Sequence, residues 1–122
     1  MAKIKLLSIA STPDAQEQGL QFVQHLSSMT GMLFRFSSPR VLNFWMRDTY
    51  VPLEIAFVDG EGKIVKTERM APLSLRTVSS GRPCVMALEV PTGTLETAGF
   101  DVGKKIKVDE KGMTVEIDEE NE

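Results

Sequence analysis

Turn signals separate the apolar segments of this chain at short intervals. Asp59-Gly60-Glu61-Gly62 and Asp109-Glu110-Lys111-Gly112 each lie between two apolar runs and are typical of β-hairpins. The sequence shows no long helical stretches that would cover a parallel sheet. The pattern therefore predicts a mainly β fold, a sandwich or a barrel, rather than βαβ units.

The apolar and aromatic runs predict seven or eight short strands and one or two short helices. Thr12-Pro13-Asp14 is typical of a helix start with Thr12 as N-cap, and Gly19 ends that helix. Residues 71–81 are predicted to be a polar loop, whereas residues 20–26 fit both a helix and a strand. The strands are predicted at residues 3–10, 31–36, 41–46, 51–58, 63–70, 84–90, 104–108 and 113–117, and a second short helix at 92–98.

Size and charge restrict the classes of function. With 122 residues, the chain has the usual size of one domain, predicted as residues 1–117 followed by an acidic, disordered tail at 118–122. The net charge is −3, but that tail holds four of the negative charges, so the body is near neutral. A near-neutral body disfavours nucleic acid and anionic membranes as partners. No apolar run is long enough to cross a bilayer, and the first residues suit a strand better than a secretory signal, so we expect a cytoplasmic monomer.

The single Cys and the single His, Cys84 and His25, restrict cofactor chemistry. A lone Cys forms no internal disulfide, and zinc needs three or four protein ligands. Cys84 follows Pro83 in an apolar run and is interpreted as a buried thiol rather than a nucleophile. The sequence also lacks the glycine-rich phosphate-binding motifs. We therefore expect no metal, no cofactor and no catalytic residue that can be named.

The only Trp and the only Tyr lie in one segment, residues 43–59, beside a cluster of opposite charges. One interpretation is a pocket wall, in which Trp45 supplies a flat face while Arg47 and Asp48 supply polar anchors. Arg76 and Ser79 would then lie at the rim. The other interpretation, which we favour, is a core corner capped by Trp45, because a large aromatic in a small β domain is usually buried.

Two carboxylates, Glu54 and Glu89, interrupt apolar strands. A buried carboxylate needs a partner, and Arg47 and Arg35 are the candidates for Glu54. An architectural ion pair is the favoured interpretation. The alternative is a carboxyl with a perturbed pKa that acts as a general acid or base.

Several short motifs occur in order over about residues 3–108, and together they are more specific for a protein family than any one of them alone. The segments are Gly19-Leu20, Gly31-Met32-Leu33-Phe34, Phe44-Trp45-Met46-Arg47-Asp48-Thr49, Pro52-Leu53-Glu54-Ile55-Ala56-Phe57-Val58-Asp59, Met70-Ala71-Pro72, Ala87-Leu88-Glu89-Val90 before Gly93, and Gly99-Phe100-Asp101-Val102-Gly103. In these segments the chain resembles the domain of unknown function 192 family of small bacterial and archaeal proteins, some of which resemble exported proteins. The resemblance implies a compact antiparallel β-sandwich or jelly-roll-like barrel with one or two short helices, and no established activity. The chain departs from the family pattern at Gln21, Asp48 and Val78, where the family tends to have Met, Asn and Tyr.

Three functions from different classes follow from these patterns. The leading hypothesis is a module that binds a small ligand or a peptide near residues 44–49, with Trp45, Arg47, Asp48, Glu54, Arg76 and Ser79 as its site. The alternatives are a protein–protein interaction domain and an enzyme that depends on Glu54 or Glu89. Because the catalytic inventory is thin, the enzyme ranks below the binding module.

Overall fold

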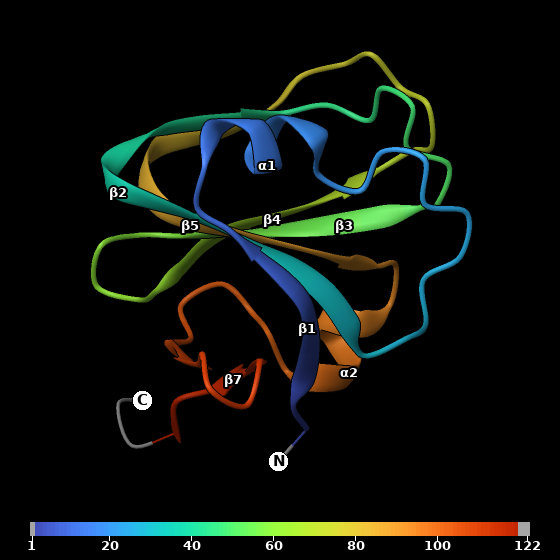
Figure 1. The fold of residues 1–122 in the computed structure, drawn as a ribbon. Coiled ribbons are helices and arrows are strands. Elements are labelled where there is room, and N and C mark those ends of the chain that lie inside the picture. Colours follow the sequence, from blue (N-terminus) through green and yellow to red (C-terminus); the bar gives the residue numbers. More distant parts are fainter. Residues whose placement is uncertain (1, 120–122) are drawn as a thin grey trace.

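A computed structural model describes residues 2–119, and in that range the chain forms one curled sheet of seven strands with two short helices (Figure 1). The strand order is β4-β3-β5-β2-β1-β7-β6. The elements are β1 (Ile4–Ala10), α1 (Pro13–Gln18), β2 (Thr30–Phe44), β3 (Leu53–Val58), β4 (Ile64–Met70), β5 (Val78–Pro91), α2 (Thr94–Ala98), β6 (Ile106–Asp109) and β7 (Thr114–Ile117).

The mainly β class with two short helices is confirmed, but the antiparallel sandwich or jelly roll is wrong. The strands form a single mixed sheet that curls into a half-barrel, and β1 and β2 pair in parallel. A parallel pair needs a long crossover connection, and the segment with α1 supplies one between Ala10 and Thr30. The sequence analysis excluded such a unit because α1 is too short to be recognised as a crossover helix.

The two longest strands differ from their predictions, since β2 was predicted as two strands and β5 as one shorter strand at 84–90. Ser37-Ser38-Pro39 was expected to separate two strands, and instead it lies in an irregular part of β2. The pairing with β5 shifts register there, between Arg35 and Arg40, and again between Val41 and Asn43. Irregularities of this kind bend and twist the strands that carry them. These bends allow the single sheet to curl into a half-barrel. The predicted loop at 71–81 is correspondingly shorter, because β5 begins at Val78.

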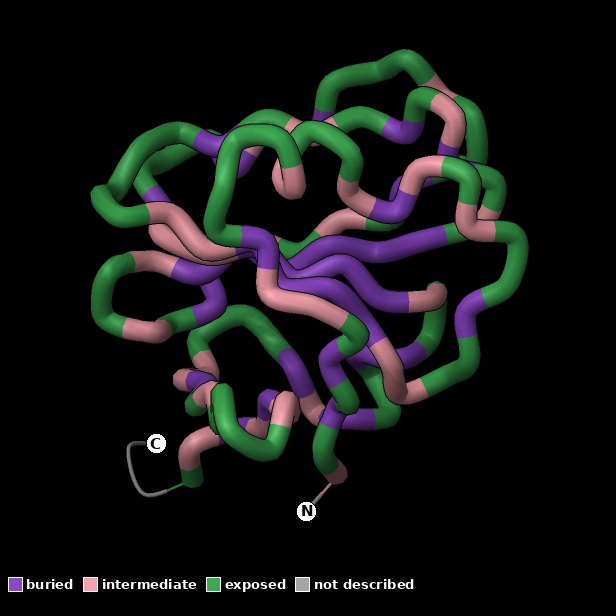
Figure 2. The backbone as a smooth tube through the Cα atoms, in the orientation of Figure 1, coloured by how far each residue is buried: buried purple, intermediate pink, exposed green. Residues whose placement is uncertain are grey.

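The sheet carries one apolar core on each face. Successive residues of a strand point to opposite faces, so β5 sends Leu88 and Val90 to one core and Ala87 to the other. The first core includes α2 and the β6–β7 hairpin, and the second lies on the side of α1 (Figure 1). The strand β3 is buried along its whole length and β2 and β5 in part of theirs, whereas much of the connecting loops is exposed (Figure 2).

Several local predictions are confirmed. Thr12 is the N-cap of α1, where its Oγ1 accepts a hydrogen bond from the Ala15 amide at 3.3 Å, and Pro13 occupies the first turn. The β3–β4 and β6–β7 hairpins form at the two predicted turns. The predicted acidic tail stays a prediction: the Asp118 amide donates to the Lys105 carbonyl at 2.8 Å, and residues 120–122 lie outside the described range. Neither described helix is long and apolar enough to span a membrane.

Gly31→Ala tests the close packing of β2 against β5. A Cβ at position 31 would lie 2.6 Å from the Glu89 carbonyl oxygen and 2.7 Å from Val90 Cγ1, so one strand must shift. We expect the free energy of unfolding in urea to fall by about 3 kcal/mol. The control is Gly60→Ala in the β3–β4 turn, whose new Cβ would meet nothing nearer than 4.0 Å and should change stability by less than about 1 kcal/mol. Equal stability of the two variants would contradict this packing.

Candidate functional site

The helix α1 is fixed over one face of the sheet by side-chain and backbone hydrogen bonds. The Gln16 amide nitrogen donates to the Ala10 carbonyl at 3.2 Å and to the Arg35 carbonyl at 2.8 Å, which joins α1 to both β1 and β2. Beyond the helix, the Phe22 amide donates to the Asp48 carbonyl at 2.7 Å. These bonds hold α1 and the loop after it against the end of β2.

Between α1, the end of β2 and β5 lies a hollow of about 280 Å³, which we name the α1 hollow. Its lining combines helix residues with aromatic side chains of β2 and with one buried carboxyl. The residues that line it are Gln16, Glu17, Gln18, Gly19, Leu20, Gln21, Phe34, Phe36, Asn43, Phe44, Trp45, Thr49 and Glu89.

Glu89 is the most unusual group in this lining. It pairs with Met32 of β2 and Ile55 of β3 in the centre of the sheet, and only 4% of its surface is exposed. No described residue donates a hydrogen bond to its carboxyl or pairs with it. No polar side-chain atom of the described core is both fully enclosed and unpartnered, so the Glu89 oxygens reach the α1 hollow.

Burial raises the pKa of Glu89 from the ordinary 4.5 to about 8. The cause is the loss of hydration of the charged form with no cation or donor to replace it. At neutral pH this carboxyl is therefore protonated, and it can donate a hydrogen bond into the hollow as well as accept one.

Aromatic rings form much of the wall. Phe34 is buried, and its ring meets that of Phe44 edge-on with centroids 5.0 Å apart. Phe36 and Trp45 each carry a guanidinium over the ring, with Arg40 Cζ 4.5 Å from the Phe36 centroid and Arg47 Cζ 5.6 Å from that of Trp45.

The structure places Trp45 at the surface, so the favoured interpretation of a core corner is wrong for this side chain. Trp45 is 45% exposed, whereas the next residue, Met46, is 1% exposed. Burial alternates along this extended segment: Leu42 and Met46 are buried, whereas Trp45 lies on the exposed side. Trp45 therefore borders the α1 hollow, as the pocket interpretation required.

Arg47 and Asp48 lie in an adjoining hollow of about 500 Å³ that shares Trp45 and Glu17 with the first. The Arg47 Nε lies 3.7 Å from the Asp48 Oδ2, and both side chains are largely in solvent. Asp48 has a positive φ of 54°, a conformation in which Asn and Asp are enriched. Asp48 therefore suits this turn.

Glu54 does not take part in the α1 hollow, and its predicted Arg47 or Arg35 partner is wrong. Its Oε1 accepts hydrogen bonds from the amides of Gly93 at 3.1 Å and Leu95 at 2.8 Å. These are free amides of the first turn of α2, so the carboxylate acts as an N-terminal cap supplied from another strand. The structural interpretation is right for Glu54, although its partners are backbone amides of α2 and not an arginine side chain.

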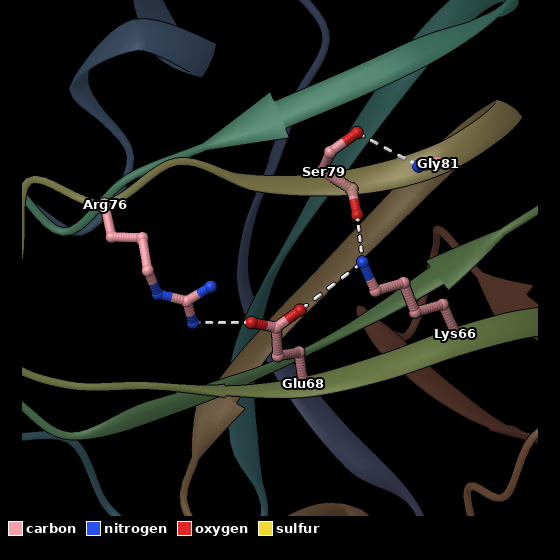
Figure 3. A network of polar contacts seen from close by, with 5 residues as sticks. All are labelled: Lys66, Glu68, Arg76, Ser79 and Gly81. Carbon is pink, nitrogen blue, oxygen red and sulfur yellow. Dashed lines mark hydrogen bonds and ion pairs between the residues drawn. The ribbon is translucent and has the colours of Figure 1, made fainter.

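Arg76 and Ser79 lie in a separate polar network between β4 and β5 (Figure 3). The Arg76 guanidinium donates a hydrogen bond to the Glu68 carboxylate at 2.5 Å. The Lys66 Nζ lies 3.4 Å from the same carboxylate and donates to the Ser79 carbonyl at 2.5 Å. The hydrogen bond from Arg76 is the main reason that the pKa of Glu68 is lowered. The six predicted site residues are therefore divided among four places.

Cys84 is fully buried in β5 and burial raises its pKa, whereas His25 is exposed in the loop before β2. The structural interpretation of the thiol agrees with this burial. Within residues 2–119, no cluster of three or more His, Cys, Asp or Glu side chains could hold a metal ion.

The sequence analysis missed the helix side of the hollow, above all Gln16 and Glu17, and the wall residues Phe34 and Phe36. Alternation along β2 could have placed both Phe side chains on one face. The helix residues gave no such signal, because the parallel pairing of β1 and β2 decides what α1 covers.

The comparisons with known proteins give a family and two solved structures. The family model DUF192, described as "Uncharacterized ACR", matches residues 2–108. A crystal structure named "putative transcription regulator" from Sinorhizobium meliloti 1021 has a TM-score of 0.76 and 33% identity over 80% of this chain and 76% of that one. A protein of unknown function from Novosphingobium aromaticivorans DSM 12444 has a TM-score of 0.76 and 30% identity over 80% of this chain and 71% of that one. None of the curated proteins matches the chain.

Glu54→Leu tests the capping role of this carboxylate. The substitution leaves the Gly93 and Leu95 amides without their acceptor, so we expect the free energy of unfolding to fall by about 3 kcal/mol. Hydrogen exchange at those two amides should accelerate. Glu61→Leu in the exposed β3–β4 turn is the control and should change stability by about 0.5 kcal/mol or less. If Glu54→Leu were as stable as this control, the cap would contribute nothing.

The raised pKa of Glu89 predicts that stability depends on pH. Between pH 4.5 and about 8 the native carboxyl keeps its proton while the unfolded one has lost it, so the free energy of unfolding falls as pH rises. Glu89→Gln removes this dependence. Urea unfolding at pH 4 to 9 should show the native protein losing a few kcal/mol relative to Glu89→Gln, since one pKa unit corresponds to about 1.4 kcal/mol. Parallel curves for the two proteins would show that Glu89 titrates normally.

Proposed function

We propose that this chain, which belongs to the domain of unknown function 192 family as its motifs predicted, is a small-ligand-binding module with the α1 hollow as its site. Ligand sites are concave, mostly apolar and provided with a few convergent polar groups. The α1 hollow is concave and more polar than this, and it combines an aromatic wall that includes Phe34 and Phe44 with convergent polar groups, among them the Glu89 carboxyl. Its volume of about 280 Å³ suits a small molecule better than a peptide.

The observation that carries the proposal is the unpartnered carboxyl of Glu89. Burying such a group costs free energy unless it is hydrogen-bonded, and Glu89 lies in an otherwise apolar core on the α1 face of the sheet. Any apolar residue of similar size would pack there at lower cost. A ligand that bonds to the carboxyl supplies the missing partner.

The same carboxyl supports acid–base catalysis as a second candidate, because its pKa of about 8 is close to a physiological pH. Binding ranks first, since the lining of the α1 hollow contains no Cys, His, Ser or Lys, and its second carboxyl, Glu17, lies at the exposed mouth. An interaction surface for another protein stays a prediction.

The name of the Sinorhizobium meliloti protein suggests a role in transcription for that protein. For this chain, the net charge of −3 gives no support to direct contact with nucleic acid. A ligand-responsive role in regulation would be compatible with the proposed site.

The proposal is tested by amide chemical shifts in the presence of small molecules from four classes: ammonium compounds, carboxylates, uncharged polyols and phosphate esters. At least one class should shift the amides of residues 16–21, 43–45 and 89 together. Trp45→Leu should weaken that binding about tenfold. Tyr50→Leu is the matched control, because Tyr50 is 44% exposed on the same loop but lies outside the lining. If no class shifts these amides, or the shifts lie elsewhere, the α1 hollow is not a ligand site.

A further inference from the structure

We propose that the ligand of the α1 hollow is a small organic ammonium cation, held by the Glu89 carboxylate and by the aromatic wall. This inference rests on the proposed function and adds the chemical class of the ligand. Three features of the hollow support it: the charges of its lining, its rings and the state of its buried carboxyl.

The charged groups of the lining are all acidic. Glu89 lies inside and Glu17 at the exposed mouth, and no Lys, Arg or His is among the lining residues. The amides of Gln16, Gln18 and Asn43 are uncharged. An anionic ligand would meet the Glu17 carboxylate with no compensating cation in the lining and could be held only by a protonated Glu89, whereas an ammonium group would meet complementary charge from Glu17 and from an ionised Glu89.

The rings of the wall favour a cation as well. Four aromatic residues border the hollow: Phe34, Phe36, Phe44 and Trp45. The face of an aromatic ring is negative and attracts a cation within about 6 Å, and such rings recognise quaternary ammonium groups. Two of these rings already hold guanidinium groups, from Arg40 at 4.5 Å and Arg47 at 5.6 Å.

Those two arginines do not fill the hollow themselves. Arg47 pairs with Asp48 in the adjoining hollow, and Arg40 lines a different hollow, of which Phe36 is also a lining residue. Neither is in the lining of the α1 hollow, so within residues 2–119 no cationic side chain pairs with the Glu89 carboxyl.

Ammonium binding must be coupled to release of a proton. In the free protein, burial keeps Glu89 protonated up to a pKa of about 8. A cation bound beside it favours the charged form and lowers that pKa. Binding of a permanent cation therefore strengthens as pH rises to about 8 and levels off above it.

The test uses pairs of probes that differ only in charge. Choline is paired with 3,3-dimethyl-1-butanol, benzylamine with benzyl alcohol, and 1,4-diaminobutane with 1,4-butanediol. Titration followed by amide shifts at pH 8.5 should show at least one ammonium probe binding at residues 16–21, 43–45 and 89 at least tenfold more tightly than its uncharged partner. For choline, whose charge is fixed, the affinity should fall about tenfold per pH unit below pH 8.

Two carboxamide variants separate the site from the surface. Glu89→Gln is close in shape to the protonated acid and should fold; it should lose at least tenfold in ammonium affinity and all pH dependence. Glu61→Gln in the β3–β4 turn should bind as the native protein does. Equal binding of charged and uncharged partners, or binding of carboxylates or phosphates alone at these amides, would overturn the ammonium assignment and leave the proposed function standing. Silence of every probe class at these amides would overturn both.

Discussion

The pairing of β2 with β5 is the interaction on which the rest of the structure depends. These strands lie in the middle of the sheet order, and their bends let one sheet curl so that each face covers a core. The close approach of Gly31 to the backbone of β5 shows how little space separates them. The same pairing places Phe34, Phe44 and Glu89 on the face that α1 covers, so the α1 hollow follows directly from the fold.

Two glutamates on neighbouring strands show how environment decides the role of a carboxyl. Glu54 and Glu89 are almost equally buried, at 8% and 4% exposed. Glu54 accepts two amides at the start of α2 and stabilises the fold. Glu89 has no partner among the described residues and costs stability as soon as it ionises. The Glu54 carboxyl therefore has a structural role, and the Glu89 carboxyl is the group for which we propose a ligand.

The sequence predicted what depends on neighbours along the chain. The cap at Thr12, the two hairpin turns and the mainly β class depend on local residue types, and they were right. The parallel pairing of β1 and β2 depends on contacts between distant segments, and it was missed. The Glu54 cap joins residues about forty positions apart, so no local pattern could reveal it. Trp45 was assigned to the core on residue type, whereas its place on the exposed side of the alternating segment 41–47 decides its exposure.

The central claim, that Glu89 is an unpartnered acid facing the α1 hollow, is tested most directly by titrating its side-chain carboxyl carbon by NMR. The signal is assigned by its loss in Glu89→Gln. The structure predicts a midpoint near pH 8 in the free protein. A midpoint near the ordinary value of 4.5 would show that the carboxyl is hydrated or paired, and it would contradict both the site and the ligand class inferred from it.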